Sequence, residues 1–333
     1  MTAEGLAGTT HDETLLFFEA GEESLFGIFT RPTVEPLGVA VIVLPGGGGG
    51  TTNRNGISVR LCRRLAAEGY HALRFDYHGI GESTGVVEQF RVDEPFVEDL
   101  EGAVRWVKAQ GIDKIVLFGN CFGARTALSY APEVEGLEGV ALGSPGPRDF
   151  AMGERTSTRL AIEWSLWDYI AKGLRPQTVR ELFDPKRRAK MARIIRTKRK
   201  ALSAKVRRRV GLAVEHDPRL VPVSPLFLEP LEALVQKRVP VLFIYGEEDD
   251  FFAEFKRAQS GRLGKILARG AGHVEIRTLP GEVHGFARTK AQGPVIDVVS
   301  EWLAERRATD ADGSSLRRGA QKATAAAAEA RAS

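Results

Sequence analysis

The stretch that decides the fold is KIVLFGNCFG, Lys114–Gly123. Its apolar first half predicts a strand, and the residues that follow it, Ala124–Tyr130, are compatible with a helix. A strand, a sharp turn and a helix with a nucleophile at the tip form the arrangement called a nucleophile elbow. Glycines suit such a turn because it is strained and neighbouring backbone leaves no room for a Cβ atom. We therefore predict that Cys121 is a nucleophile in a G-x-C-x-G pattern; the alternative is a buried cysteine on an ordinary turn.

Length and composition indicate a globular protein. With 333 residues, 43% hydrophobic and 27% charged, the chain can form one large α/β domain that carries an insertion. No apolar run approaches the ~20 residues of a membrane span, and the first 14 residues lack the apolar core of a secretory signal. Cys62 and Cys121 are the only cysteines, too few for a disulfide framework. We expect a reduced, cytoplasmic setting without stable membrane association.

The net charge of +4 comes from a single patch. Residues 186–209 contain 13 Lys or Arg and no Asp or Glu, so the rest of the chain is net acidic. The basicity is therefore no property of the whole protein, and we expect no nucleic-acid partner.

Strands and helices alternate through most of the chain, which predicts a doubly wound, mainly parallel sheet. The expected strands are 15–18, 24–29, 38–44, 71–76, 114–118, 140–143, 239–245 and 274–276; the expected helices include 58–68, 95–110, 253–260 and 295–306. The alternation stops between residues 147 and 230, where the sequence predicts helices only. We expect a core domain of residues 14–146 and 231–308, a helical insertion at 147–230, and a disordered tail from 309 to 333.

Five sequence landmarks occur in a fixed order. They are Gly46–Gly50, the segment FDYHGIGES at 75–83, the cysteine elbow, Gly246-x-x-Asp249 and His284-Gly285-Phe286. Together they resemble the α/β-hydrolase superfamily over about residues 14–308. A cysteine elbow is similar to those of dienelactone hydrolases, polyhydroxyalkanoate synthases and some polyketide-pathway thioesterases and acyl-processing enzymes. Dienelactone hydrolases usually lack so long and basic an insertion, and polyhydroxyalkanoate synthases are usually larger, so no subfamily is identified.

The resemblance implies an α/β-hydrolase fold with a helical lid and a triad in the chain order nucleophile, acid, histidine. A cysteine nucleophile needs a base within hydrogen-bond reach and an acid that orients the base. Asp249 follows the strand after the insertion and is the expected acid; Asp250 is the near alternative and Asp149 a weaker third. His284 is the expected base, because no other histidine falls between the final strand and the final helix.

An anion hole is expected beside the nucleophile, formed by the amide of Phe122 and by the loop of Gly46 and Gly47. A phosphate-binding P-loop is excluded because no Gly-Lys-Ser/Thr follows the glycine run.

Three further side chains are candidate substrate contacts: His78, which follows a predicted strand, and Trp164 and Trp167 in the insertion. The alternative for the two tryptophans, which is about as frequent for such aromatic pairs, is that they only pack in the hydrophobic core. The basic segment 186–209 could dock an acidic acyl carrier protein or the phosphates of coenzyme A; otherwise it is a solvated helix face.

These features predict an enzyme that acts on an ester or thioester through a Cys121–His284–Asp249 triad, by hydrolysis or acyl transfer, with no metal or redox cofactor. A thiolate suits exchange with thioesters and activated esters. The first alternative is a lyase, in which His284 and Asp249 abstract a proton and expel a carboxylate such as acetate without acylation of Cys121. The second is a noncatalytic protein that binds a carrier protein.

Overall fold

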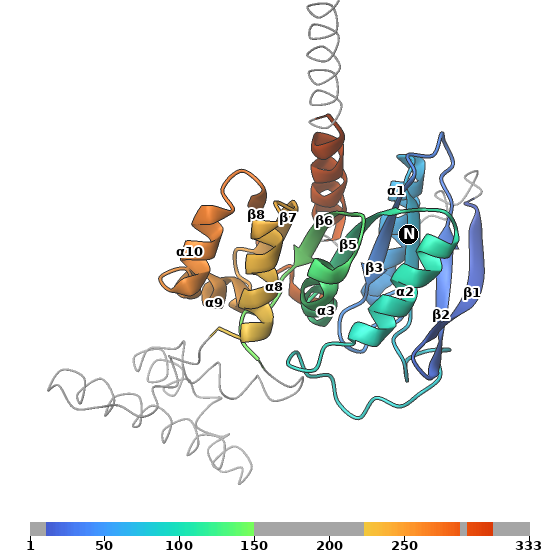
Figure 1. The fold of residues 1–333 in the computed structure, drawn as a ribbon, viewed down its shortest axis with the longest axis horizontal. Helices are drawn as coiled ribbons and strands as arrows, with labels where there is room; N and C mark the ends of the chain where they lie inside the picture. The colour runs from blue at the N-terminus through green and yellow to red at the C-terminus, as the bar shows by residue number, and fades with distance from the viewer. Residues whose placement is uncertain (1–10, 150–222, 287–291, 309–333) are drawn as a thin grey trace, which may run out of the picture.

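The computed structural model describes residues 11–149, 223–286 and 292–308 (Figure 1). Their strands form one eight-stranded sheet in the order β1-β2-β4-β3-β5-β6-β7-β8. The strands are β1 (Glu13–Ala20), β2 (Glu23–Thr30), β3 (Val39–Leu44), β4 (His71–Phe75), β5 (Lys114–Asn120), β6 (Leu137–Gly143), β7 (Val241–Gly246) and β8 (Val274–Leu279). The predicted fold class is confirmed.

Only the first strands of the sheet run antiparallel to their neighbours. β1 pairs with β2 and β2 with β4 in antiparallel register, whereas all pairs from β4 to β8 are parallel. The chain moves from β3 to β4 on one side and later enters β5 on the other side of β3. Strand order therefore reverses between β3 and β5, and binding sites of open α/β sheets lie at the carboxyl ends of the strands at such a point.

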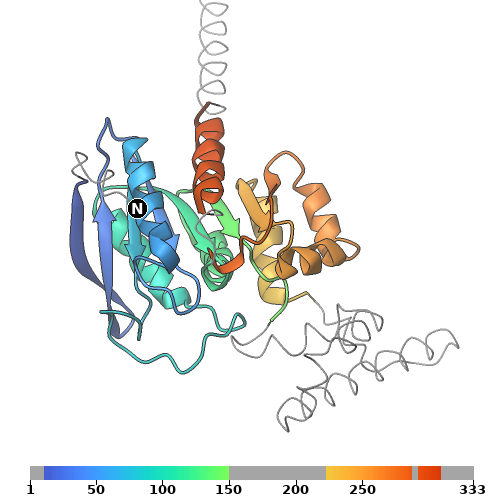
Figure 2. The same cartoon turned by 180° about the vertical axis from the view of Figure 1, so that it is seen from behind.

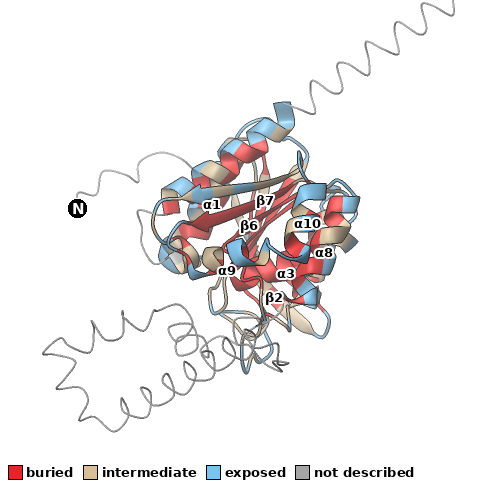
Figure 3. Ribbon diagram, turned by 90° about the vertical axis from the view of Figure 1, so that its left-hand side faces the viewer, coloured by how far each residue is buried: buried red, intermediate tan, exposed pale blue. Residues whose placement is uncertain are grey.

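Helices cover both faces of the sheet (Figures 1 and 2). The helices and 3₁₀ turns are η1 (Arg54–Gly56), α1 (Ile57–Ala67), α2 (Val97–Ala109), α3 (Phe122–Tyr130), η2 (Ala131–Glu133), α8 (Pro225–Gln236), α9 (Asp250–Ala258), α10 (Arg262–Arg269), η4 (His284–Phe286) and a C-terminal helix, 292–308. Buried side chains of α2, α3, α8, α9 and α10 share one core, and those of α1 and the C-terminal helix share the other. The strands between them are the buried centre of the molecule (Figure 3).

The observed elements match the expected ones, except that two helices, α8 and α10, are not among those predicted. Helix α10 was not predicted; it is short, contains Gly264 and carries three basic residues, and only Leu263 and Ile266 are buried. Helix α8 includes residues 225–230, which are predicted to belong to the insertion, and its Phe227 and Leu231 are buried in the core. Trp164, Trp167 and the basic segment 186–209 lie outside the described residues. Among the helices of the described ranges, none is long and apolar enough to cross a membrane.

The carboxylate of Glu13 ties strand β1 to the rest of the sheet. It accepts hydrogen bonds from Nε and Nη2 of Arg63 at 3.0 and 3.2 Å and from Nη1 of the buried Arg74 at 3.2 Å. Burial raises the pKa of Glu13, but the two guanidinium groups outweigh burial and lower it from 4.5 to about 2.

We expect Glu13→Gln to lower the free energy of unfolding at pH 6 to 7 and to have progressively less effect as the pH falls. A carboxyl with a lowered pKa in the folded state stabilises that state above its unfolded pKa, so this stabilisation is lost between about pH 5 and pH 2. Urea unfolding of both proteins across this range measures the difference, and Glu22→Gln in the exposed β1–β2 turn is the control. A difference independent of pH would contradict the assignment.

Candidate active site

The turn after β5 is strained in the way a nucleophile elbow requires. Cys121 has φ 52° and ψ −109°, and it lies between the end of β5 and the start of α3. A Cβ atom on Gly119 would lie 2.3 Å from the carbonyl oxygen of Gly123, and one on Gly123 would lie 2.4 Å from the carbonyl oxygen of Pro45. Both glycines are therefore needed for the chain to turn this sharply against the neighbouring loop.

The sulfur of Cys121 faces an imidazole. Nε2 of His284 lies 3.1 Å from Sγ of Cys121, within the distance for a hydrogen bond to sulfur. The buried ring of Phe251 packs edge-on against the imidazole, with the ring centroids 4.5 Å apart. Cys121 is only 5% exposed. The fold thus brings together two residues separated by 163 positions, and their geometry permits proton transfer from sulfur to nitrogen.

Asp249 anchors the loop that carries His284. Its buried carboxylate accepts hydrogen bonds from the amides of Val283 (2.9 Å), His284 (2.8 Å) and Gly246 (2.7 Å), and from Oγ of Ser144 (2.6 Å). The contact from the His284 amide fixes the backbone of the candidate base. Sequence reasoning missed Ser144, because a serine after a strand carries no distinctive pattern; its positive φ of 43° appears only in the structure.

The two other candidate acids are exposed, whereas Asp249 is buried. Asp250 is exposed at the start of α9. Asp149 forms an ion pair with Arg125, whose Nη2 lies 2.9 Å from its carboxylate. Arg125 is fully buried on α3 and also donates to the carbonyl of Gly146 and to Oγ of Ser224. Burial lowers the pKa of Arg125, although the Asp149 carboxylate opposes that shift.

The residues expected to form the anion hole, Phe122 and Gly46, lie at the elbow. Phe122 is the first residue of α3, where backbone amides have no partner within the helix. A Cβ atom on Gly46 would lie 3.9 Å from Cβ of Cys121, so the glycine loop passes directly beside the candidate nucleophile. The buried carboxylate of Asp76 accepts a hydrogen bond from the amide of Thr51 and thereby anchors the far end of this loop. Burial raises the pKa of Asp76, and the amides of Thr51 and Glu82 oppose that rise.

His78 is held by a carboxylate. Its Nδ1 lies 2.9 Å from Oδ1 of Asp99, and its backbone amide donates to Oδ2 of the same residue. The ring packs on Phe96, which in turn contacts the ring of Phe122. His78 therefore belongs to an aromatic cluster that reaches the elbow, and its role as a substrate contact stays a prediction.

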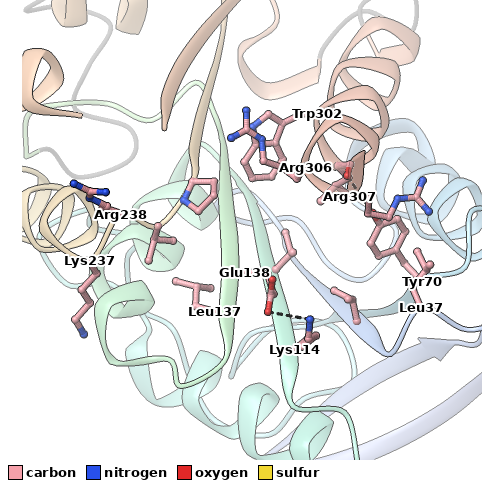
Figure 4. Close-up of a pocket in the computed structure, with 15 residues that line it drawn as sticks. Leu37, Tyr70, Lys114, Leu137, Glu138, Lys237, Arg238, Trp302, Arg306 and Arg307 are labelled. Carbon is pink, nitrogen blue, oxygen red and sulfur yellow. Dashed lines mark hydrogen bonds and ion pairs between the residues drawn. The ribbon is translucent and has the colours of Figure 1, made fainter. Parts of the chain in front are cut away.

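A cavity of about 630 Å³ lies at the amino ends of the central strands, whereas the candidate site lies at their carboxyl ends (Figure 4). It adjoins the first residues of β3, β5 and β6, with the ion pair of Lys114 and Glu138 at its floor and Trp302 on one side. Of the described residues that line it, none is a His, Cys, Ser, Thr or Asp. The cavity is thus separate from the candidate site, whose residues all follow the carboxyl ends of strands. Within residues 11–149, 223–286 and 292–308, no three His, Cys, Asp or Glu side chains gather as metal ligands.

We expect Cys121→Gly to be more stable than Cys121→Ala by about 1–2 kcal/mol, because glycine adopts a positive φ without the strain that a Cβ atom brings. Urea unfolding of the two variants measures the difference. Cys62 in α1 is the matched control, because in a helix the order reverses and alanine is favoured by about 1 kcal/mol. Equal stability of the two variants at position 121 would show that the elbow is unstrained.

Comparison with solved structures agrees with the fold. The solved structure of the esterase Pf2001 from Pyrococcus furiosus aligns with 89% of this chain and 91% of its own, with a TM-score of 0.54 and 17% identity. A dienelactone hydrolase from Anabaena variabilis aligns with 89% of this chain and 99% of its own, with a TM-score of 0.51 and 15% identity. At such identities the likeness shows the fold alone.

Sequence comparison gives the family. The quorum-quenching protein AidA of Acinetobacter baumannii is 31% identical over 128 residues, which are 37% of this chain and only 40% of that relative. The sequence profile of the alpha/beta hydrolase family matches residues 41–284, a range from β3 to the candidate base. This match covers well over half of the protein, and the chain belongs to the alpha/beta hydrolase family.

Proposed function

We propose that the protein hydrolyses a small carboxylic ester or thioester, with Cys121 as nucleophile, His284 as general base and Asp249 as the acid that positions the base. The observation that carries the proposal is the 3.1 Å approach of Nε2 of His284 to Sγ of Cys121 in a family of hydrolases. Transfer of the acyl group to an acceptor other than water uses the same first step.

In that first step Cys121 gives its proton to Nε2 of His284, and the thiolate attacks the carbonyl carbon. The carbonyl electron pair moves to oxygen, where it accepts hydrogen bonds from the amides of Phe122 and of Gly46 or Gly47. Collapse of this intermediate restores the carbonyl and breaks its bond to the leaving alcohol or thiol, which takes the proton from His284. The product is an acyl thioester on Cys121.

In the second step His284 removes a proton from water, and the hydroxide attacks the acyl thioester. The carbon–sulfur bond breaks, the carboxylic acid leaves, and the thiolate recovers the proton from the imidazolium. Asp249 keeps the base in place in both steps through its hydrogen bond from the amide of His284.

Several features suggest which substrates to test and which residues contact them. The name of the A. baumannii relative adds molecules that act in quorum sensing to the esters and thioesters worth screening. His78, beside the aromatic cluster at the elbow, is proposed to contact the substrate, as are Trp164 and Trp167. Docking of an acidic acyl carrier protein or coenzyme A through residues 186–209, which lie outside the described residues, is proposed from sequence.

We expect Cys121→Ala and His284→Ala each to lower kcat/KM on a p-nitrophenyl ester or an acyl-coenzyme A thioester by at least 10³-fold, because nucleophile and base act as one unit. Asp249→Asn is expected to lower it by about 10²- to 10⁴-fold and Asp250→Asn to have little effect. Cys62→Ala and His273→Ala are matched controls away from the site. Rates come from steady-state kinetics, and intact-mass analysis of rapidly quenched wild-type protein detects the acyl adduct.

The alternatives give different results. Turnover retained in Cys121→Ala, with loss in His284→Ala and no adduct, would reject covalent catalysis and favour the lyase. If no substrate turns over and no adduct forms, but an acidic carrier protein binds in a strongly salt-dependent manner, the noncatalytic function would be favoured.

A further inference from the structure

The guanidinium of Arg54 lies beside Gly285, the residue that follows the candidate base, and it has no partner among the described residues. Its Nη1 is 3.7 Å from the position that a Cβ atom on Gly285 would take, and Gly285 directly follows His284. The side chain is exposed and has no hydrogen bond or ion pair with another residue of the described chain. Within the described part of the chain, a positive charge with several N–H donors is thus left without a partner beside the loop of His284.

The backbone turns sharply on both sides of Arg54. Asn53 and Asn55 have φ of 53° and 56°, positive values that asparagine adopts more readily than other non-glycine residues. Two side chains stabilise the turn: Oδ1 of Asn53 accepts the amide proton of Arg54 at 2.7 Å, and the amide group of the buried Gln292 donates to the Arg54 carbonyl at 3.1 Å. The segment is thus fixed from both sides, by its own turn and by the C-terminal helix.

The fold sets the position of Arg54 relative to Cys121 and His284. Turn η1, which begins with Arg54, contacts η4, which begins with His284. Nε2 of His284 reaches Sγ of Cys121 at 3.1 Å. A substrate whose carbonyl lies on the sulfur can therefore extend past the imidazole toward the guanidinium. A free guanidinium is suited to bidentate hydrogen bonds with a carboxylate.

We infer that Arg54 binds a carboxylate carried by the substrate, so that the protein prefers anionic esters or thioesters over neutral ones. This inference rests on the proposed function for its biological meaning and names the class of substrate that the site accepts. Arg54 is then a specificity-determining residue: it acts on binding of the charged group and takes no part in bond formation.

Alkylation of Cys121 tests the inference without any ester. Iodoacetate and iodoacetamide differ in charge but scarcely in size, and both alkylate a thiolate with loss of iodide. Cys62 does not compete, because it is fully buried and burial raises its pKa to about 11. The ratio of the two alkylation rates, followed by intact mass with peptide mapping, measures the attraction of an anion to the site.

We expect Arg54→Gln to lower the ratio of the iodoacetate rate to the iodoacetamide rate about fivefold or more, with the iodoacetamide rate nearly unchanged. Arg54→Lys should keep part of the preference, because it keeps the charge but loses the bidentate geometry. Arg60→Gln, at an exposed arginine on the neighbouring helix α1, is the matched control and should leave the ratio unchanged. A ratio that is the same in Arg54→Gln and wild type would overturn the inference.

A matched pair of esters links the result to turnover. With p-nitrophenyl hydrogen glutarate, Arg54→Gln should raise KM about tenfold with little change in kcat, while KM for the neutral p-nitrophenyl valerate stays nearly constant. Equal changes of KM for the two esters would count against Arg54 as the residue that binds a carboxylate. If wild-type protein hydrolyses neither ester, the proposed function loses support, and the alkylation ratio still decides the role of Arg54.

Discussion

The site depends on parallel strand pairs that end in register. Leu44 of β3 pairs with Gly119 of β5, so the glycine loop and the elbow leave the sheet side by side. Gly246 of β7 pairs with Leu279 of β8, and the segments that follow these residues carry Asp249 and His284. Backbone hydrogen bonds of the sheet thus set the relative positions of four turns before any side chain of the site contributes. A shift of register in either pair would separate the groups.

The buried carboxylate of Asp249 then joins the second pair of turns into one unit. A buried charge is unfavourable unless hydrogen bonds replace the lost water, and here backbone amides and the hydroxyl of Ser144 do so. These donors come from the ends of β6 and β7 and from the loop after β8. A single carboxylate thus fixes three chain segments relative to one another. This explains how the loop of His284 can hold a defined position although it has no regular secondary structure.

The sequence predicted the elements whose signals are local. Buried strands such as β3 and β7 are continuous apolar runs, and the turn at Cys121 has the glycine spacing that close backbone contact demands. From these signals follow the sheet and the candidate nucleophile, whereas Asp249 and His284 were predicted from the chain order that the family resemblance implies. Helix α10 was missed because its apolar face is only two residues wide and a glycine interrupts it.

Side-chain partnerships that depend on tertiary contacts were beyond sequence reasoning. Ser144 hydrogen-bonds to a residue 105 positions away, and Arg54 contacts a loop more than 200 positions away. A turn is predicted by the composition of Asn53-Arg54-Asn55-Gly56, but this composition does not predict which part of the protein the turn contacts. The pairing of Asp149 with Arg125 likewise needed the fold, because sequence alone left Asp149 as a weaker candidate for the acid.

The buried Arg125 has a consequence for how this protein can be engineered. Nη2 of Arg125 contacts Oδ1 of Asp149 at 2.9 Å and Oγ of Ser224 at 3.1 Å, and the amide of Ser224 donates to the carbonyl of Pro147 at 2.9 Å. The chain that leaves the core after Asp149 therefore returns to it at almost the same point. A replacement for the sequence between these two ends therefore has to bridge only a short gap between fixed points of the core.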